Sequence, residues 1–178
     1  PTVGCTMSWG SKPGEFRVII DNMMNLELLM WATKYTGDPS YAKVAVTHAN
    51  TTLKNHFRPD GSSFHLVNYN PETGGINRKQ TVQGYEDSSA WARGQAWGLY
   101  GYTMMYRETK DTKYLDQAKK IAQFILSHPN LPADKIPYWD FNSPGIPNAY
   151  RDASAAAINA SALLELAGYV DNTLAGKY

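Results

Sequence analysis

The sequence has little of what marks several common protein classes. It contains one cysteine, Cys5, among 178 residues, which excludes an internal disulfide framework. Its formal net charge of +1 leaves no excess of basic residues for binding nucleic acid or an anionic membrane surface. No apolar run reaches the roughly 20 residues that a membrane-spanning helix needs. We therefore expect one domain with its own core, and neither nucleic acid nor a membrane as its partner.

Motifs for metals and phosphates are missing as well. No pair of His or Cys residues has the spacing of zinc ligands, and no glycine-rich loop is of the kind that binds phosphates. The sequence therefore predicts no metal and no cofactor. Aromatic residues, in contrast, are abundant, with 12 Tyr and 5 Trp. Their flat, amphipathic rings suit either a large aromatic core or the stacking of sugars.

Asp21 is the most informative acidic residue. It lies in the segment 18–32 (VIIDNMMNLELLMWA), which is apolar on most faces and therefore predicts a buried helix, although residues 18–20 also suit a strand. Carboxylates are rarely buried unless they are paired or functional, and burial raises their pKa towards neutrality. A carboxyl group of this kind can both give and accept a proton near pH 7. The alternative is that Asp21 caps the helix.

Two segments of the chain are similar to each other. Residues 36–42 (TGDPSYA) and 109–115 (TKDTKYL) each follow an apolar helix and precede an amphipathic one. Recurrence of this unit predicts stacked helical hairpins, in which buried inner helices are wrapped by outer helices as an α/α toroid, with a plain helical bundle as the alternative. The expected inner helices are about 18–35, 90–108 and 152–169, and the expected outer helices are about 41–57 and 114–127.

Long connections precede the second and third inner helices. Residues 58–89 and 129–150 are rich in Pro, Gly and Ser, and loops of this length in a compact domain usually carry function. They lead into the N-terminal ends of the inner helices, so we expect the functional site on that rim. The histidines of the outer helices, His48, His56 and His128, are expected to face solvent.

The candidate site residues on this rim are polar or aromatic. Arg93 and Trp97 are four residues apart and so share a helix face, where they would suit an acidic sugar. Arg93 could instead pair with Glu86 or Asp87 beside a core Trp. The full candidate set is Asp21, His65, Gln83, Arg93 and Trp97.

Three further residues have competing interpretations. His65 is a lone histidine in an alternating stretch, which more often indicates a structural role. Asp152 is expected to cap the third inner helix, with a possible pairing to Arg151. Asp140 is either a second acid or part of the loop structure.

Three segments of the chain resemble the unsaturated glucuronyl hydrolases of glycoside hydrolase family 88. They are residues 19–25 (IIDNMMN), 85–98 (YEDSSAWARGQAWG) and 151–156 (RDASAA). The resemblance implies an all-α (α/α)6 barrel. Family members are about twice as long, so residues 1–178 would form a single partial toroid domain that lacks the N-terminal half and the C-terminal end. The rest of the barrel, with a second important Asp, would come from further sequence or another chain, and the isolated chain should be inactive.

The resemblance also implies a reaction and roles for the candidate residues. The family removes the 4,5-unsaturated glucuronic acid that polysaccharide lyases leave on oligosaccharides. Asp21 would protonate C4 of the vinyl ether and assist the addition of water at C5, while His65, Gln83, Arg93 and Trp97 would bind the substrate. The alternatives are a family 105 unsaturated rhamnogalacturonyl hydrolase, a non-catalytic sugar-binding toroid and a structural repeat scaffold. A bacterial source is implied, with either the cytoplasm or the periplasm as the compartment.

Overall fold

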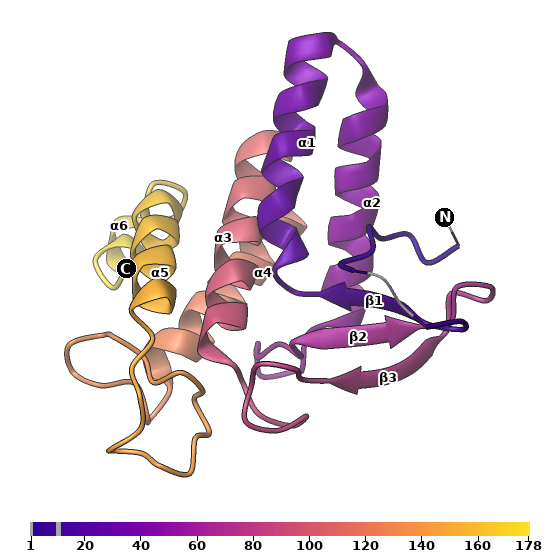
Figure 1. Cartoon of the computed structure of the whole chain (residues 1–178). Coiled ribbons are helices and arrows are strands. Elements are labelled where there is room, and N and C mark those ends of the chain that lie inside the picture. The colour runs from indigo at the N-terminus through magenta and orange to yellow at the C-terminus, as the bar shows by residue number, and fades with distance from the viewer. Residues whose placement is uncertain (1, 10–11) are drawn as a thin grey trace.

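A computed structural model describes residues 2–9 and 12–178 of the chain. The inner helices α1, α3 and α5 lie side by side with α3 in the middle, while α2 packs against α1 and α4 against α3 (Figure 1). A small antiparallel sheet lies below the helices in the same view. In chain order the elements are β1 (Phe16–Ile19), α1 (Asn22–Thr36), α2 (Pro39–Asn55), β2 (Leu66–Tyr69), β3 (Ile76–Gln80), α3 (Ala92–Thr109), α4 (Thr112–Ser127), α5 (Ala153–Ala167) and α6 (Asn172–Ala175).

The helices confirm the predicted hairpins, with boundaries that differ by a few residues. The largest difference is at the first inner helix, where residues 18 and 19 belong to strand β1 and the helix starts only at Asn22. Asp21 therefore stands between a strand and a helix rather than inside a helix. No helix within residues 2–9 and 12–178 combines the length and apolarity needed to span a bilayer.

The two turns that repeat in the sequence have the same structure. In the first, Gly37 takes a left-handed conformation, the Thr36 hydroxyl accepts a hydrogen bond from the Asp38 amide, and the Asp38 carboxylate caps α2 by accepting one from the Ser40 amide. This closes one helix and starts the next within three residues. The equivalent residues of the second turn are Thr109, Lys110 and Asp111.

The three-stranded sheet was not predicted, and it corrects the expectation of a loop over residues 58–89. The strands lie in the order β1-β2-β3, with Val18 opposite Val67 and Ile19 opposite Leu66. Val67 and Val18 are fully buried, and all of β2 is buried. The sequence of β1 is too short to distinguish a strand from the start of a helix. Its pairing with β2 supplies the backbone hydrogen bonds that make it a strand.

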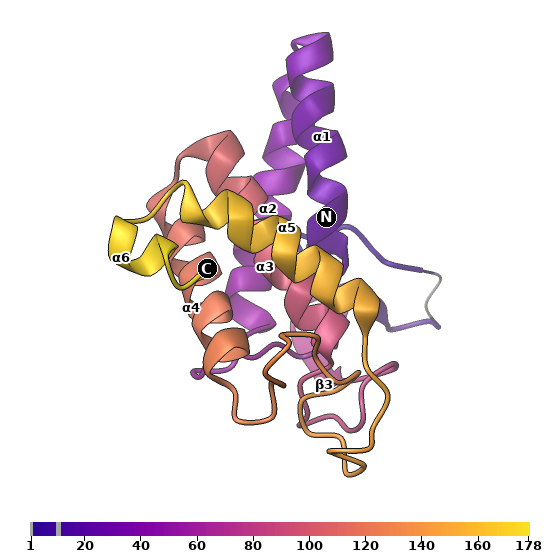
Figure 2. The ribbon, with the colours of Figure 1, turned by 90° about the vertical axis from the view of Figure 1, so that its left-hand side faces the viewer.

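The expected rim is present. The N-terminal ends of α1, α3 and α5 all lie at the end of the molecule that carries the sheet and the long loop before α5 (Figures 1 and 2). The tight turns after α1 and α3 lie at the opposite end. The long connections therefore meet where the inner helices begin.

The predicted burial of the first inner helix holds on one side only. Leu26 and Met30 of α1 are buried, whereas Leu28, Trp31 and Tyr35 are 67%, 55% and 77% exposed. The exposed side chains are three or four residues apart and form one stripe, along which the Trp31 and Tyr35 rings stack at 5.0 Å. Helix α1 is thus apolar on two faces, and the described residues bury only one of them.

Polar contacts also join the three inner helices. Arg107 of α3 bonds to Glu27 of α1 and to Glu165 of α5, and the Tyr100 hydroxyl donates to Glu27. Tyr100 and Arg107 are two turns apart on α3 and so share a face. This network fixes the three inner helices to one another.

The expectation that His48 and His56 face solvent is wrong. Both are fully buried, because the N-terminal segment and β1 cover this side of α2. The Thr6 amide donates to His48 Nδ1 at 3.1 Å, and His56 Nε2 donates to the Val18 carbonyl at 3.1 Å. Burial lowers the pKa of His48 to about 4 and that of His56 to about 3. His128 is half-buried, with its ring against those of Phe124 and Phe141.

Helices α1 and α3 approach closely at Gly101. A Cβ at this position would overlap the Met23 Cβ and lie 3.1 Å from the Met23 backbone carbon. At Gly98, one turn earlier, a Cβ would instead make a 3.4 Å contact with the end of the Phe57 ring. Of these two glycines, Gly101 is therefore the one that the packing of α1 against α3 requires.

We predict that acid destabilises the fold through His48 and His56. The folded state holds both histidines neutral, so the stability they contribute is complete above the unfolded pKa of about 6.5 and falls as the pH drops below it. Between pH 8 and pH 5 the free energy of unfolding should fall by about 2 kcal/mol per histidine. Urea denaturation at both pH values measures this. His48→Gln should reduce the pH dependence, and a larger reduction in His128→Gln would contradict the assignment.

We also predict that Gly101→Ala is destabilising, although alanine favours helices. The overlap with Met23 must separate α1 from α3, which costs about 1–3 kcal/mol and outweighs a helix-propensity gain of about 1 kcal/mol. The matched variant Gly98→Ala should be neutral or slightly stabilising. Thermal unfolding of both variants measures the difference, and equal Tm values would show that the two helices tolerate separation.

Candidate active site

Asp21 begins the site at the junction of β1 and α1. Its backbone is helical, with φ −57° and ψ −29°, and within the described chain its side chain makes no capping hydrogen bond, so the capping alternative is wrong. The side chain is 19% exposed, but its Oδ2 atom is covered and has no hydrogen-bond partner among the described residues. Burial raises the pKa of this carboxyl to about 6, and a hydrogen bond from its own backbone amide and the positive charge of Arg93 oppose the rise only in part.

His65 lies against Asp21 because β1 pairs with β2. The Ile20 amide donates to the His65 carbonyl at 2.9 Å, which continues the ladder to the end of both strands. The His65 Nε2 atom then lies 3.8 Å from Asp21 Oδ2. On the other side of the ring, Nδ1 accepts hydrogen bonds from the amides of Val82 and Gln83, at 3.0 and 3.2 Å.

Asp21 and His65 are both uncharged over part of the pH range. Burial lowers the pKa of His65 to about 4, while burial raises that of Asp21 to about 6. The distance between the two side chains is that of an ion pair, but these pKa directions favour an uncharged contact over a histidinium–carboxylate pair. The site thus combines a carboxyl group able to exchange protons near neutrality with an uncharged histidine.

Arg93 brings a positive charge to the same rim. Its Nε lies 3.8 Å from Asp152 Oδ2, and its guanidinium carbon lies 5.1 Å from the centre of the Trp91 ring. The Trp91 ring in turn lies 4.5 Å from the ring of His65. The Arg93 side chain, about one third exposed, therefore lies on the same rim as Asp21, with the Trp91 ring next to its guanidinium group.

The alternative pairings considered for these residues are wrong. Asp87 pairs with Arg78 and Glu86 accepts from the Ser88 hydroxyl, so neither neutralises Arg93. Asp152 does cap α5, accepting from the Ala155 amide at 2.8 Å. Its other oxygen faces Arg93, because Arg151 points away and pairs with Asp134.

Gln83 and Trp97 are placed less directly. Gln83 is exposed, and it contacts His65 through its backbone amide rather than its side chain. Trp97 lies one turn after Arg93 on α3, half-buried, with its ring edge-on to that of Tyr100 at 6.1 Å. The ring next to the guanidinium is that of Trp91, which the sequence interpretation missed. Trp91 comes just before a helix, where a tryptophan is more readily interpreted as a core or capping residue. The sequence feature that could have identified it is its position two residues before Arg93.

Asp140 is a structural loop residue. It is fully buried, and its Oδ2 accepts from the Tyr85 amide at 2.9 Å and from the Ser89 hydroxyl at 2.7 Å. Its Oδ1 accepts from the Asn142 amide at 2.9 Å. With its oxygens committed to holding loops, Asp140 is not the second acid, and the loop interpretation is confirmed.

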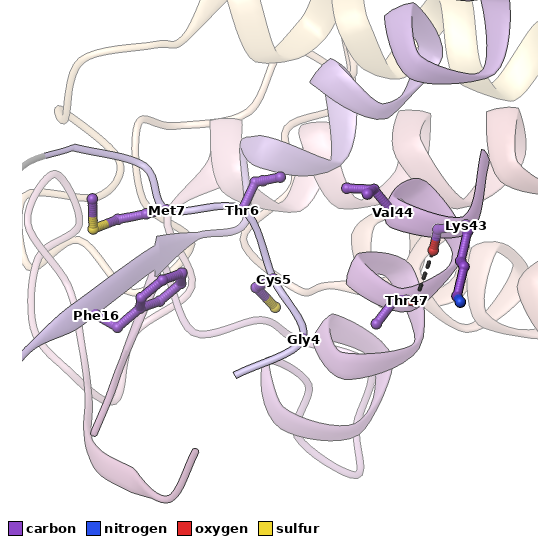
Figure 3. Close-up of a pocket in the computed structure, with 8 residues that line it drawn as sticks. All are labelled: Gly4, Cys5, Thr6, Met7, Phe16, Lys43, Val44 and Thr47. Atoms are coloured by element: carbon purple, nitrogen blue, oxygen red, sulfur yellow. Dashed lines mark hydrogen bonds between the residues drawn. The ribbon is translucent and has the colours of Figure 1, made fainter. Parts of the chain in front are cut away.

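The described residues hold no cluster of three or more His, Cys, Asp or Glu side chains that could bind a metal. A separate hollow of about 660 Å³ lies between the N-terminal segment and α2 (Figure 3), away from Asp21 and His65. Its walls are mostly apolar, and the candidate set contributes none of them. They are formed by Gly4, Cys5, Thr6, Met7, Phe16, Lys43, Val44 and Thr47.

The rim brings together a group able to exchange protons, a cation and aromatic rings. Asp21 can donate a proton when neutral and accept one when charged. Arg93 can bind a carboxylate, and the rings of Trp91 and Trp97 offer apolar faces.

Comparison with known proteins identifies relatives of this chain. The sequence profile of Glycosyl Hydrolase Family 88 matches residues 7–165. The unsaturated glucuronyl hydrolase of Formosa agariphila is 57% identical over 173 residues, which are 96% of this chain and 43% of that protein. The chain thus spans a little less than half the length of this curated relative.

Solved structures agree with the match. The crystal structure of an unsaturated glucuronyl hydrolase specific for heparin is 50% identical, with a TM-score of 0.94 over 99% of this chain and 49% of that one. A mutant of the Streptococcus agalactiae unsaturated glucuronyl hydrolase, complexed with dGlcA-GalNAc6S, is 38% identical, with a TM-score of 0.76 over 90% of this chain and 43% of that one. The predicted fold class, half of an (α/α)6 barrel, is confirmed, with the small sheet as an addition.

We predict that Asp21→Asn stabilises the folded state at alkaline pH. Because the folded pKa is raised, the favourable contribution of Asp21 is complete below its unfolded pKa and is lost as the pH rises through about 6. Above that pH the neutral amide should increase the free energy of unfolding by about 3 kcal/mol, and below pH 4 the gain should vanish. Denaturant titrations at the two pH values measure it. The exposed Asp116→Asn is the control, and a gain independent of pH would rule out a buried charge.

Proposed function

Since the chain belongs to glycoside hydrolase family 88, we propose that it supplies the acid–base part of an unsaturated glucuronyl hydrolase. The observation that carries the proposal is the Asp21 carboxyl, buried at the rim, with its pKa raised to about 6 beside a neutral histidine and a cationic arginine. The relatives named above are unsaturated glucuronyl hydrolases, which supports the same reaction for the protein that contains this chain.

The proposed reaction uses both protonation states of Asp21. The substrate ring is a vinyl ether with a C4=C5 double bond. Neutral Asp21 gives its proton to C4, and electrons of the double bond form the new C–H bond, which leaves a positive charge shared by C5 and the ring oxygen. Water adds at C5 and loses a proton to the Asp21 carboxylate. The resulting hemiketal opens as the bond from C5 to the ring oxygen breaks, which makes C5 a ketone and moves the hydroxyl proton to the former ring oxygen. C1 is now a hemiacetal; its bond to the leaving sugar breaks, C1 becomes an aldehyde, and the hemiacetal proton ends on the oxygen of the leaving sugar.

The rest of the rim suits the charge and shape of such a substrate. Arg93 would bind the uronate carboxylate, because its guanidinium is partly exposed and only loosely paired with Asp152 at 3.8 Å. The rings of Trp91 and Trp97 would line the pocket, and Gln83 would reach polar groups from its exposed loop. We propose lyase-generated oligosaccharides as the substrate class, in keeping with the dGlcA-GalNAc6S bound to the Streptococcus agalactiae relative.

We also propose that the rest of the barrel completes this half. The exposed apolar stripe of α1, made by Leu28, Trp31 and Tyr35, and the exposed Leu164 of α5 would pack against further inner helices. The relatives are about twice as long as this chain, which supports this expectation. Those helices would belong to further sequence or to another chain and would bring the second acid.

We predict that the completed barrel removes unsaturated glucuronic acid and that Asp21→Asn abolishes the activity. The amide keeps the shape of the carboxyl but cannot exchange the proton, so kcat should fall by about 10²- to 10⁴-fold. Loss of the ultraviolet absorbance of the double bond in an unsaturated glycosaminoglycan disaccharide measures turnover.

Asp116→Asn, on the exposed face of α4, is the matched control and should be fully active. Turnover that survives in Asp21→Asn would remove Asp21 from the mechanism. Binding without loss of absorbance in the wild-type protein would overturn the hydrolase and favour a sugar-binding module. Preference for rhamnogalacturonan-derived disaccharides would point to family 105 chemistry instead.

A further inference from the structure

We propose that His65 is a positioning residue, held as the Nε2–H tautomer by the backbone of the 81–91 loop, so that its ring N–H faces the Asp21 carboxyl group. The tautomer follows from hydrogen bonds that do not depend on the reaction. Its catalytic consequence rests on the proposed function.

The hydrogen bonds at Nδ1 allow one neutral tautomer. The amides of Val82 and Gln83 both point at this nitrogen, and a backbone N–H can only donate. Nδ1 must therefore accept and carries no proton. A neutral imidazole has one N–H, so it lies on Nε2, the nitrogen that faces Asp21 at 3.8 Å. The Thr81 hydroxyl, 3.4 Å from the same Nδ1, can donate to it as well.

The N–H of His65 then points towards the covered side of the Asp21 carboxyl group. Oδ2 lies 3.8 Å from His65 Nε2, and neither atom has a hydrogen-bond partner among the described residues. Because Oδ2 is covered while the side chain is 19% exposed, Oδ1 lies on the open side of the carboxyl group.

The loop that supplies the two amides is itself held by Asp140. The buried Asp140 carboxylate accepts from the Tyr85 amide and the Ser89 hydroxyl, on the far side of the loop from His65. Gly84 packs so closely that an added Cβ would lie 3.1 Å from Asp140 Oδ2. The backbone between Thr81 and Ser89 is thereby fixed at both ends, because the Thr81 amide also donates to Asp87.

For the proposed reaction, this arrangement holds a ring N–H beside the covered oxygen of the carboxyl group and leaves Oδ1 on the side that the sugar can approach. His65 Nε2 and Asp21 Oδ2 are both covered, so water does not compete for the space between them. His65 would act without gaining or losing a proton itself.

The tautomer can be observed directly by long-range ¹H–¹⁵N correlation of the histidine rings in the completed barrel at neutral pH. The expected result is an unprotonated Nδ1 and a protonated Nε2 for His65, with the signals assigned by their loss in His65→Gln. A protonated Nδ1, or a ring protonated at both nitrogens, would overturn the proposal. The spectrum needs no turnover, so it separates this proposal from the proposed function, which fails only if wild-type protein leaves the unsaturated sugar intact.

The role of Asp140 is tested by Asp140→Asn, with Ser89→Ala as a milder variant in case the first does not fold. Each should move the His65 ring signals towards a mixture of tautomers and lower kcat, by about 10- to 100-fold for Asp140→Asn. The signals of buried His48 and His56 should not move, and the exposed Glu72→Gln should match the wild type. Unchanged His65 signals in both Asp140→Asn and Ser89→Ala would overturn the role of Asp140.

Discussion

The site depends on the antiparallel register of β1 against β2. This register places Ile19 opposite Leu66, and the next hydrogen bond, from the Ile20 amide to the His65 carbonyl, sets His65 beside Asp21. The two residues are far apart in sequence and share no helix. A shift of one residue would turn every side chain of β1 to the other face of the sheet, which would expose Val18. A sheet of three short strands therefore fixes the geometry that the helices alone would leave open.

Burial then sets the electrostatics. It opposes charge on both partners, so the carboxyl of Asp21 becomes a weaker acid and the imidazole of His65 a weaker base. Arg93 would favour the charged carboxylate, but Asp152 at the start of α5 shares its charge. His65 just before β2, Arg93 in α3 and Asp152 at the N-cap of α5 thus each contribute one group that tunes a single acid just before α1.

The sequence predicts structure that depends on residues close together in the chain, and it misses contacts between residues far apart in the chain. The inner and outer helices and their turns follow from periodicity and from residues a few positions apart. Strands β2 and β3 are short and paired non-locally, so their pattern within residues 58–89 reads as loop. His48 and His56 lie on a helix of polar composition that reads as solvated, yet the N-terminal segment covers them. Trp91 gains its role only from contacts with His65, which arrives from another element.

The two identical turns at the far end of the inner helices have an evolutionary consequence. Gly37 and Lys110 each close a helix, and an aspartate starts the next one within a residue. Hydrogen bonds between residues two apart hold each turn, so an inserted residue would break them. The long connections at the opposite end, next to Asp21, are not confined to so few residues. They can therefore be lengthened or replaced while Asp21 and its supporting helices stay in place.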